Sequence, residues 1–269
     1  AGTYKLVITD GNGCKDSTMT NAVVNASPTA GASSNSPVCE GGTLTLSSTP
    51  NGMTSYAWVG PNGYTSNSQN PTVTTNATTS HAGTYTVTVT DGNGCSDSEN
   101  VIVTINSAPT TYNVTGGGSY CAGGTGVLVG LSGSQVGVNY QLRRNGVNTG
   151  SPVAGTGSAI SFGYQTLAGT YTVVGTNGTT GCTRLMNGSV DVTINTPPTP
   201  TANNNGPVCE GSTLSLSGLP GSGVTYQWSG PNSFSSTLQN PVVSTSATLS
   251  MAGTYKLVIT DGNGCKDST

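Results

Sequence analysis

Charge is scarce in this sequence. Only 6% of the 269 residues are charged, and the formal net charge is −3. The chain has just three arginines, Arg143, Arg144 and Arg184. Proteins that bind nucleic acid carry clustered lysine and arginine on one surface. We therefore predict that the chain has no nucleic-acid partner.

Long apolar runs and helical periodicity are also missing. No apolar stretch approaches the roughly 18 residues that a membrane-spanning helix needs, and no window repeats with a helical period. We predict no membrane insertion. The chain instead contains many short runs of Val, Ile, Leu and Tyr, separated by some of its 40 glycines and 14 prolines. This pattern is typical of an all-β sandwich.

The sequence has few side chains that could act in catalysis. The single histidine, His81, precedes an Ala-Gly-Thr-Tyr motif, and the equivalent positions elsewhere hold Leu167 and Met251. A position that holds Leu or Met in the sister repeats has a packing or surface role and not a catalytic one. Without a catalytic histidine, the chain cannot form a Ser–His–Asp triad. We predict that the chain is not an enzyme and has no catalytic residues.

A metal site is not expected either. The segment DGNGCSD places Asp91, Asn93 and Asp97 close together. It lacks the ligand spacing and the bidentate Glu of a calcium-binding loop. We interpret it as a hairpin turn capped by Asp91, and we predict no metal and no cofactor.

One stretch of eighteen residues occurs twice without a change. AGTYKLVITDGNGCKDST stands at 1–18 and at 252–269, an offset of 252 − 1 = 251 residues, with degenerate copies at 82–99 and 168–184. Repeats at fixed spacing indicate an array of similar units. We predict a tandem array with this offset as its period, of which the chain is one period plus the overlap.

The repeats divide the chain into four parts. Residues 1–26 are predicted to be the C-terminal part of a preceding domain, 27–108 a complete domain, 109–198 a divergent domain, and 199–269 a domain that lacks its last strand. That missing strand corresponds to MTNAVVNAS, which the chain has at 19–27. Segments that contain proline lie at the predicted boundaries. Proline interrupts strand pairing, so we interpret these segments as linkers between domains.

Seven cysteines occur at regular spacing. Cys39 and Cys95 are as far apart in the sequence as Cys209 and Cys265 (95 − 39 = 265 − 209 = 56), and Cys121 and Cys182 are almost as far apart (182 − 121 = 61). One disulfide per domain is the natural interpretation, and it implies an oxidising, extracellular location. Cys14 is left over, and we expect its partner to lie in a neighbouring repeat.

These motifs resemble immunoglobulin-like domains. A Trp follows the first Cys at the same spacing in two domains (58 − 39 = 228 − 209 = 19), and Ala-Gly-Thr-Tyr is similar to the tyrosine-corner region of that fold. The departure is that the second Cys lies ten residues after the Tyr (85 to 95). The expected bridge then joins the start of the second strand to the last hairpin. The core anchors implied are Trp58, Trp228, Tyr85, Tyr171 and Tyr255.

More closely, the segments VCEGGTLTLSS, YAWVGPNG and AGTYTVTVTDGNGC resemble Ig-like repeats of giant secreted surface proteins of the Bacteroidota. That resemblance implies tandem immunoglobulin-like β-sandwich domains and a secreted, cell-surface or extracellular location. Arrays of this kind are similar to stalks, adhesins and extracellular fibres.

Two functional hypotheses follow. The first is a structural protein of an extracellular filament or stalk, with a three-domain period and copies of itself as partner. The alternative is a surface adhesin that binds glycans, with 109–198 as the reader domain and with Tyr140, Arg143 and Arg144 as ligand contacts. The 18-residue overlap argues against separate subunits joined by strand exchange, because each junction would then carry the penultimate strand twice.

Overall fold

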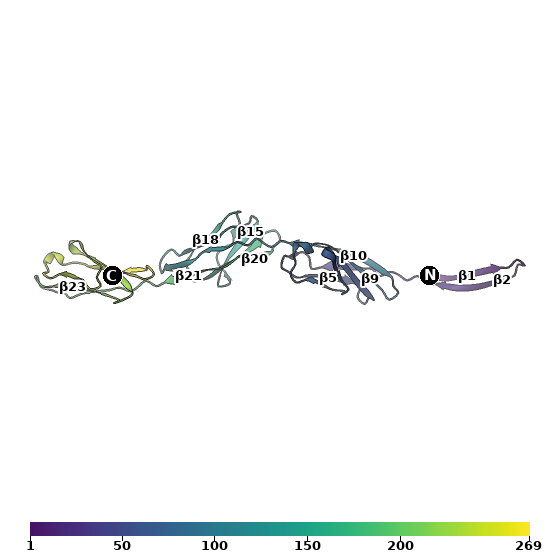
Figure 1. Cartoon of the computed structure of the whole chain (residues 1–269), viewed down its shortest axis with the longest axis horizontal. Helices are drawn as coiled ribbons and strands as arrows, with labels where there is room; N and C mark the ends of the chain where they lie inside the picture. The colour runs from purple at the N-terminus through teal and green to yellow at the C-terminus, as the bar shows by residue number, and fades with distance from the viewer. The chain divides into compact units, whose positions relative to one another are not determined.

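The computed structural model describes residues 1–269, and its regular elements are mostly short β-strands (Figure 1). It divides into two units, Ala1–Ala108 and Pro109–Thr269. Apart from strands it contains only 3-10 helices of three residues, Pro61–Gly63, Thr79–His81, Pro231–Ser233 and Leu249–Met251. None of its helices has the length and apolar character needed to cross a membrane.

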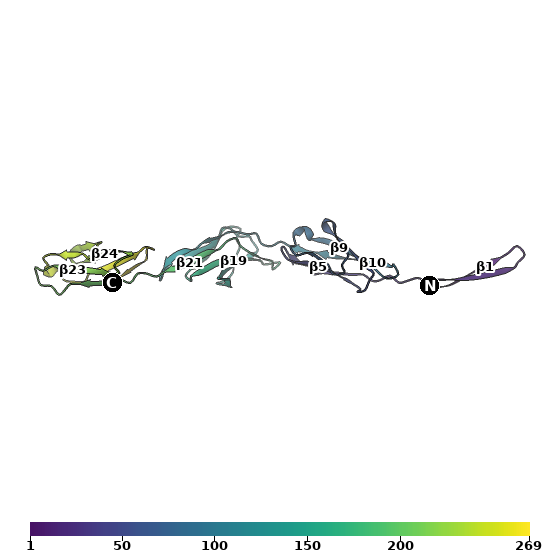
Figure 2. The same cartoon turned by 60° about the horizontal axis from the view of Figure 1, so that its bottom comes forward.

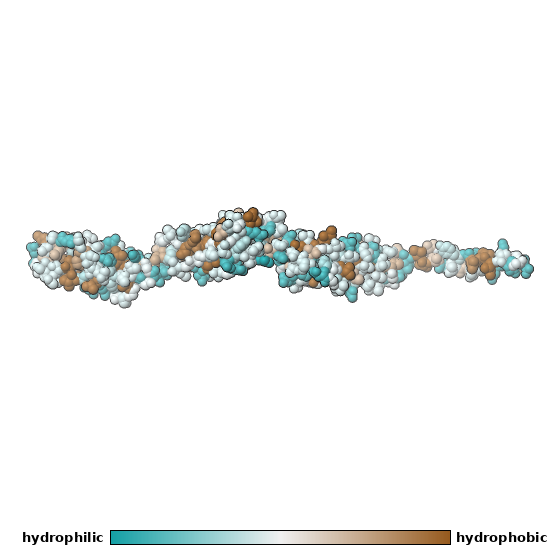
Figure 3. All heavy atoms as spheres, turned by 45° about the horizontal axis from the view of Figure 1, so that its top comes forward, coloured by the Kyte–Doolittle hydropathy of each residue, from teal (hydrophilic) through white to brown (hydrophobic).

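Unit 1 begins with an isolated hairpin of β1 (Gly2–Thr9) and β2 (Lys15–Ala22). The two strands pair in antiparallel register, with Tyr4 opposite Thr20. Its large apolar side chains are exposed, including Leu6 at 61% and Ile8 at 60%. Figure 3 shows this as hydrophobic patches on the hairpin. A two-stranded hairpin on its own is marginally stable in water, so packing of its apolar side chains against another sheet would stabilise it.

Residues 27–108, here called the first sandwich, form two antiparallel sheets. One sheet has the order β3-β5-β8 and the other β10-β9-β6-β7. A short parallel pair joins β4 to β11. The strand bounds are β3 (Gly31–Ser34), β4 (Val38–Cys39), β5 (Leu44–Thr49), β6 (Ser55–Gly60), β7 (Tyr64–Ser66), β8 (Thr72–Thr74), β9 (Gly83–Thr90), β10 (Ser96–Val103) and β11 (Ile105–Asn106).

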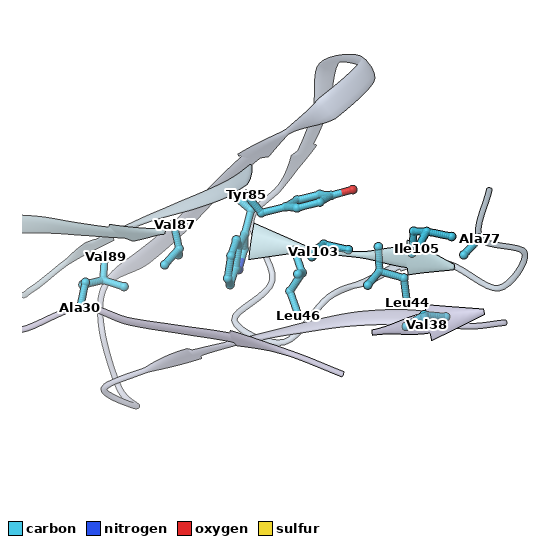
Figure 4. Close-up of a cluster of buried hydrophobic side chains, with 11 residues drawn as sticks. Ala30, Val38, Leu44, Leu46, Ala77, Tyr85, Val87, Val89, Val103 and Ile105 are labelled. Carbon is cyan, nitrogen blue, oxygen red and sulfur yellow. The ribbon is translucent and has the colours of Figure 1, made fainter. Parts of the chain in front are cut away.

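The core of the first sandwich lies between its two sheets. In β9 every second residue, Tyr85, Val87 and Val89, is fully buried, while the intervening threonines are not. This is the period of two that places alternate side chains on opposite faces of a strand. Leu44 and Leu46 of β5 belong to the same cluster (Figure 4). Alternation in the sequence therefore selects which face of each strand enters the core.

Residues 109–198, the second sandwich, repeat this plan with additional short strands. The sheet orders are β12-β14-β18 and β13-β21-β19-β15-β16, with β17 on β15 and β20 on β19. The bounds are β12 (Val114–Gly116), β13 (Gly118–Cys121), β14 (Val127–Leu131), β15 (Val138–Arg144), β16 (Val147–Asn148), β17 (Val153–Ala154), β18 (Ile160–Gln165), β19 (Gly169–Asn177), β20 (Thr183–Leu185) and β21 (Val190–Asn195).

Residues 199–269, the third sandwich, have sheets of the order β22-β23-β26 and β25-β24-β27-β28 (Figure 2). Leu216 of β23 packs with Trp228, Leu257 and Ile259 from the other sheet. The bounds are β22 (Thr201–Asn204), β23 (Leu214–Leu219), β24 (Val224–Gly230), β25 (Phe234–Ser236), β26 (Val242–Ser244), β27 (Lys256–Asp261) and β28 (Lys266–Ser268).

The predicted fold class is confirmed: the chain is an all-β tandem of immunoglobulin-like sandwiches. Each sandwich also has the tyrosine corner of that fold. The Tyr85 hydroxyl donates to the carbonyl of His81 at 3.0 Å, and Tyr171 and Tyr255 donate to Leu167 and Met251 in the same way. Because the acceptor is a backbone carbonyl, the side chain at that position is free to vary.

Candidate functional site: cysteines at the domain ends

A disulfide joins the second sandwich to the third. Cys121 and Cys265 are bonded with an S–S distance of 2.04 Å and a Cα–Cα distance of 5.5 Å, at a sequence separation of 144. Cys265 is fully buried. The bridge therefore provides a second covalent connection between two consecutive domains, alongside the linker.

Cys121 is placed by the last strand of its own domain. It ends β13, which runs parallel to β21 with Cys121 in register with Asn195. The amide of the next residue, Ala122, donates to the Asn195 carbonyl at 2.9 Å. The first cysteine of the domain is thus held at the end where the chain leaves for the next domain.

Cys265 is placed by the hairpin turn of the following domain. The Asp261 carboxylate accepts the amide N–H groups of Asn263 and Cys265 at 2.9 and 2.8 Å. Gly264 adopts a φ of 80°, a left-handed conformation that favours glycine. The Asp10 and Asp91 carboxylates accept the corresponding bonds in their own turns. The Asp-Gly-Asn-Gly-Cys sequence therefore builds a rigid turn that presents its cysteine.

The expectation of one disulfide inside each domain is wrong for Cys121, and Cys95 and Cys209 are free thiols. The physical reason is visible in the first sandwich. Cys39 is in register with Asn106, and the chain runs extended through β10 and β11 from Cys95 to Asn106. At about 3.3 Å per residue of extended chain, the two cysteines are roughly 35 Å apart. A disulfide needs Cα atoms within about 7 Å.

The remaining cysteines are distributed as follows. Cys39 and Cys182 are disulfide-bonded, and Cys14 is free and exposed. The regular spacing of the cysteines is real, but it arises because every domain carries one cysteine at each end. The same spacing fits bridges within domains and bridges between them, so spacing alone could not choose.

The prediction that Tyr140 is a ligand contact is wrong. Its side chain is fully buried in the core of the second sandwich, and its hydroxyl accepts the amide N–H of Gln135 at 2.8 Å. Tyr140 follows Cys121 at the spacing that separates Trp58 from Cys39 (140 − 121 = 58 − 39 = 19). It is the equivalent of the tryptophan, and that shared spacing is the signal that sequence reasoning missed.

The two arginines beside it do not form a reader site with it. Arg143 and Arg144 are both half-buried on β15. The Arg144 guanidinium donates to the carbonyl of Ala168 at 3.1 Å, and Nε of Arg143 is buried without a hydrogen bond. With Tyr140 in the core, no aromatic ring from this set is exposed for a sugar to stack on.

The core anchors lie as follows. Trp58 and Trp228 are buried and donate their indole N–H to the carbonyls of Gln69 and Gln239. Tyr85 and Tyr171 are buried and Tyr255 is half-buried. Tyr64 and Phe234 make edge-to-face contacts with Tyr85 and Tyr255, with ring centroids 5.6 Å apart in both pairs. These rings extend the core and cover the tyrosine corner.

Comparison with known proteins gives only distant structural likeness. No protein-family model and no curated protein matches the chain. Among solved structures, murine CEACAM1b is 15% identical with a TM-score of 0.35, covering 62% of this chain and 100% of its own. A 1.5-MDa bacterial ice-binding adhesin is 14% identical with a TM-score of 0.34, covering 91% and 96%. Fibronectin(III)-like modules of CbhA from Clostridium thermocellum are 12% identical with a TM-score of 0.34, covering 61% and 94%. Likeness at this level carries no conclusion about function.

Proposed function

We propose that this chain is a structural protein of an extracellular filament or stalk, built as a tandem array of immunoglobulin-like domains. The period of the array is three domains, the offset between the two identical copies of AGTYKLVITDGNGCKDST. The protein has no catalytic role in this proposal, and its partners are further copies of the same repeat. The disulfides support an oxidising, extracellular location.

The observation that carries the proposal is the Cys121–Cys265 bridge between consecutive domains. A bridge inside one domain protects that domain only. A bridge between domains adds a covalent path in parallel with the linker at 196–200, so tension on the array is shared by two connections. It also restricts the orientations that the linker permits. Both effects suit a filament whose function is to transmit force along its length.

The test is the molecular mass of the native material after denaturation and reduction, combined with electron microscopy. We expect a species far larger than the 26.7 kDa of this chain, and fibres with a repeat of three beads. A single band near one period together with isolated particles would contradict the proposal.

A further inference from the structure

The third sandwich has an open groove beside Cys209. It has a volume of about 340 Å³, and its lining includes Val208, Glu210, Leu214, Leu216, Ala247 and Tyr255. Cys209 itself is a free, exposed thiol. The groove has apolar walls and one carboxylate at its edge, which suits an extended peptide segment that is mostly apolar.

The equivalent space in the first sandwich is filled by β11. There Ile105 is 7% exposed and Val103 is 2% exposed, and both belong to the core. The amides of Val38 and Glu40 donate to the carbonyls of Thr104 and Asn106, at 3.1 and 2.9 Å. Val208 and Glu210 occupy the same positions in the third sandwich (38 + 170 and 40 + 170), and the segment around them is not a strand there.

The residues that line the groove are more exposed in the third sandwich than their equivalents in the first. Leu44 and Val38 are buried in the first sandwich, whereas their equivalents Leu214 and Val208 are only half-buried in the third. The Glu40 carboxylate accepts the amide of Ala108 at 3.1 Å, while Glu210 is exposed. The third sandwich has no equivalent of β11. That one difference explains the more exposed Leu214 and Val208, the lack of a parallel strand pair, and the Glu210 carboxylate without a partner.

The chain contains a segment that matches this space. Residues 22–27 read Ala-Val-Val-Asn-Ala-Ser, and they align with 103–108 at an offset of 81. Val24 aligns with the buried Ile105, and Val23 with the exposed Thr104. In unit 1, where they follow the isolated hairpin, both valines are exposed, at 76% for Val23 and 75% for Val24.

We propose that the groove of the third sandwich receives residues 19–27 of the next copy of this repeat, and that Cys209 forms a disulfide with Cys95 of that copy. In the tandem array, residues 252–269 of this copy are the same residues as 1–18 of the next copy, so the next copy continues directly with its residue 19. Its Val24 enters the groove, and the Glu210 carboxylate accepts the amide of its Ser27. This inference rests on the proposed tandem array and identifies the junction between successive periods.

The positions of the cysteines support the same arrangement independently. Cys265 Sγ lies 4.0 Å from the carbonyl oxygen of Asn195, and it is bonded to Cys121, the residue in register with Asn195. Cys95 Sγ also lies 4.0 Å from a carbonyl oxygen, that of Asn25. Asn25 is the equivalent of Asn106, which is in register with Cys39.

Docking of residues 19–27 would therefore place Asn25 of the next copy in register with Cys209. Cys95 of that copy is already beside Asn25, so the two thiols would meet as Cys121 and Cys265 do. Closing the bridge releases two protons and two electrons. A small-molecule disulfide accepts them by exchange and leaves as two thiols.

The experiment uses a chain with two copies, residues 1–269 followed by a second 19–269. Cys95 of the first copy and Cys209 of the second are replaced by Ser, because neither has a partner in this chain and their peptides would be confused with the pair under test. The chain is folded in a glutathione redox buffer. The protein is then alkylated, digested without reduction and mapped by mass spectrometry. We expect a peptide pair that links Cys209 of the first copy to Cys95 of the second. Replacing Cys209 of the first copy with Ser should leave that Cys95 alkylated. An alkylated Cys209 of the first copy in this two-copy chain, or a different partner for it, would overturn the proposal.

Two matched substitutions in the second copy test the groove. Val24→Arg places a charge where Ile105 is buried, and we expect the alkylated fraction of Cys209 to rise at least threefold. Val23→Arg faces solvent at the Thr104 position and should leave that fraction unchanged. Equal effects of the two substitutions would contradict docking in this register. In the 269-residue chain Val24 is exposed, so Val24→Arg there controls for folding of the rest.

The outcome separates this junction from the proposed function. If native material forms fibres but the two-copy chain lacks the bridge, then the junction is wrong and the filament stands. If the bridge forms but native material is a single small species, then the junction chemistry is real and the filament proposal is wrong.

Discussion

Single carboxylates organise the turns that present the cysteines. The Asp261 carboxylate accepts two backbone N–H groups inside one five-residue turn. Together the two bonds contribute about 1–3 kcal/mol, because the acceptor is charged but only half-buried and the donors otherwise lack a partner within the chain. The sequence alone indicates that the equivalent Asp91 is a cap, since Asp is favoured where a side chain bonds to the backbone two residues on.

We predict that Asp261→Ala lowers the free energy of unfolding of the third sandwich by about 1–3 kcal/mol. Urea denaturation followed by tryptophan fluorescence measures the change, in a Trp58→Phe background where Trp228 is the remaining tryptophan. Asp267→Ala is the matched control, because Asp267 accepts only the amide of the adjacent Ser268. A loss of equal size in the control would contradict the role assigned to Asp261.

Four tyrosines that are buried or half-buried contribute to the pH dependence of stability at alkaline pH. Burial raises the pKa of Tyr85, Tyr140, Tyr171 and Tyr255 above the ordinary value of 10.0. The unfolded chain therefore loses these protons at a lower pH than the folded protein. The stability contributed by each neutral tyrosine is complete below about pH 10 and is lost as the pH rises through the folded-state pKa.

We expect these tyrosines to cause no loss in the free energy of unfolding up to about pH 10, and a fall as the pH rises further. Urea titrations from neutral to strongly alkaline pH, with ultraviolet absorbance to report tyrosinate, would show it. Tyr171→Phe should reduce the slope above about pH 10. A slope that is unaffected by this substitution would show that Tyr171 does not contribute.

At the scale of the strand, alternation and spacing carry most of the fold. The period of two in AGTYTVTVTD correctly places Tyr85, Val87 and Val89 on one face, because a half-buried strand needs that pattern. The Cys-to-Trp spacing identifies the core anchor in two domains, and it holds in the remaining one, where Tyr140 replaces the tryptophan. The neighbouring arginines favour a binding role for Tyr140, but its spacing from Cys121 indicates a core position.

The cysteine pairing cannot be predicted in the same way. The spacing between two cysteines gives their separation along the chain. It does not show at which end of the sandwich each cysteine lies. That depends on the parallel pairing of β4 with β11 and of β13 with β21, which brings the first cysteine to the end of the last strand. Non-local strand pairing of this kind has no local sequence signal.

Tyr140 is a fully buried member of the core between the two sheets of the second sandwich. Tyr140→Ala should lower the free energy of unfolding of the second sandwich by about 3–5 kcal/mol, the range for removing a large buried aromatic side chain. Tyr140→Phe should cost about 1–2 kcal/mol, since the Gln135 amide loses its acceptor.

Chemical denaturation of the disulfide-bonded chain measures both changes. Tyr164→Ala is the control, because Tyr164 is 64% exposed, and it should change stability by less than about 0.5 kcal/mol. If Tyr140→Ala were as mild as the control, then Tyr140 would not be a core anchor and its assignment to ligand binding would have to be reconsidered.

At the scale of the molecule, the decisive feature is that a covalent bond crosses a domain boundary. Cys121 and Cys265, at a sequence separation of 144, close a loop that contains most of two domains. On the chain-entropy model, closing a loop of this length stabilises the folded state by about 5 kcal/mol. That stabilisation is shared, because neither sandwich can unfold completely without the loop restricting its unfolded chain.

We therefore predict that removing the bridge weakens the second and third sandwiches together. In the Cys121→Ser/Cys265→Ser variant, both should melt at lower temperature. Forced unfolding should release the chain between Cys182 and Cys265, which the bridge otherwise holds back, while Cys182 itself stays disulfide-bonded. With the bridge intact, the segment between Cys121 and Cys265 cannot extend under load, and the measured contour length per period should be shorter by that segment. Single-molecule pulling with and without reductant makes the comparison within one protein. If reductant left the contour length unchanged, the bridge would not lie in the path of force, and the two-connection junction on which the filament proposal rests would be wrong.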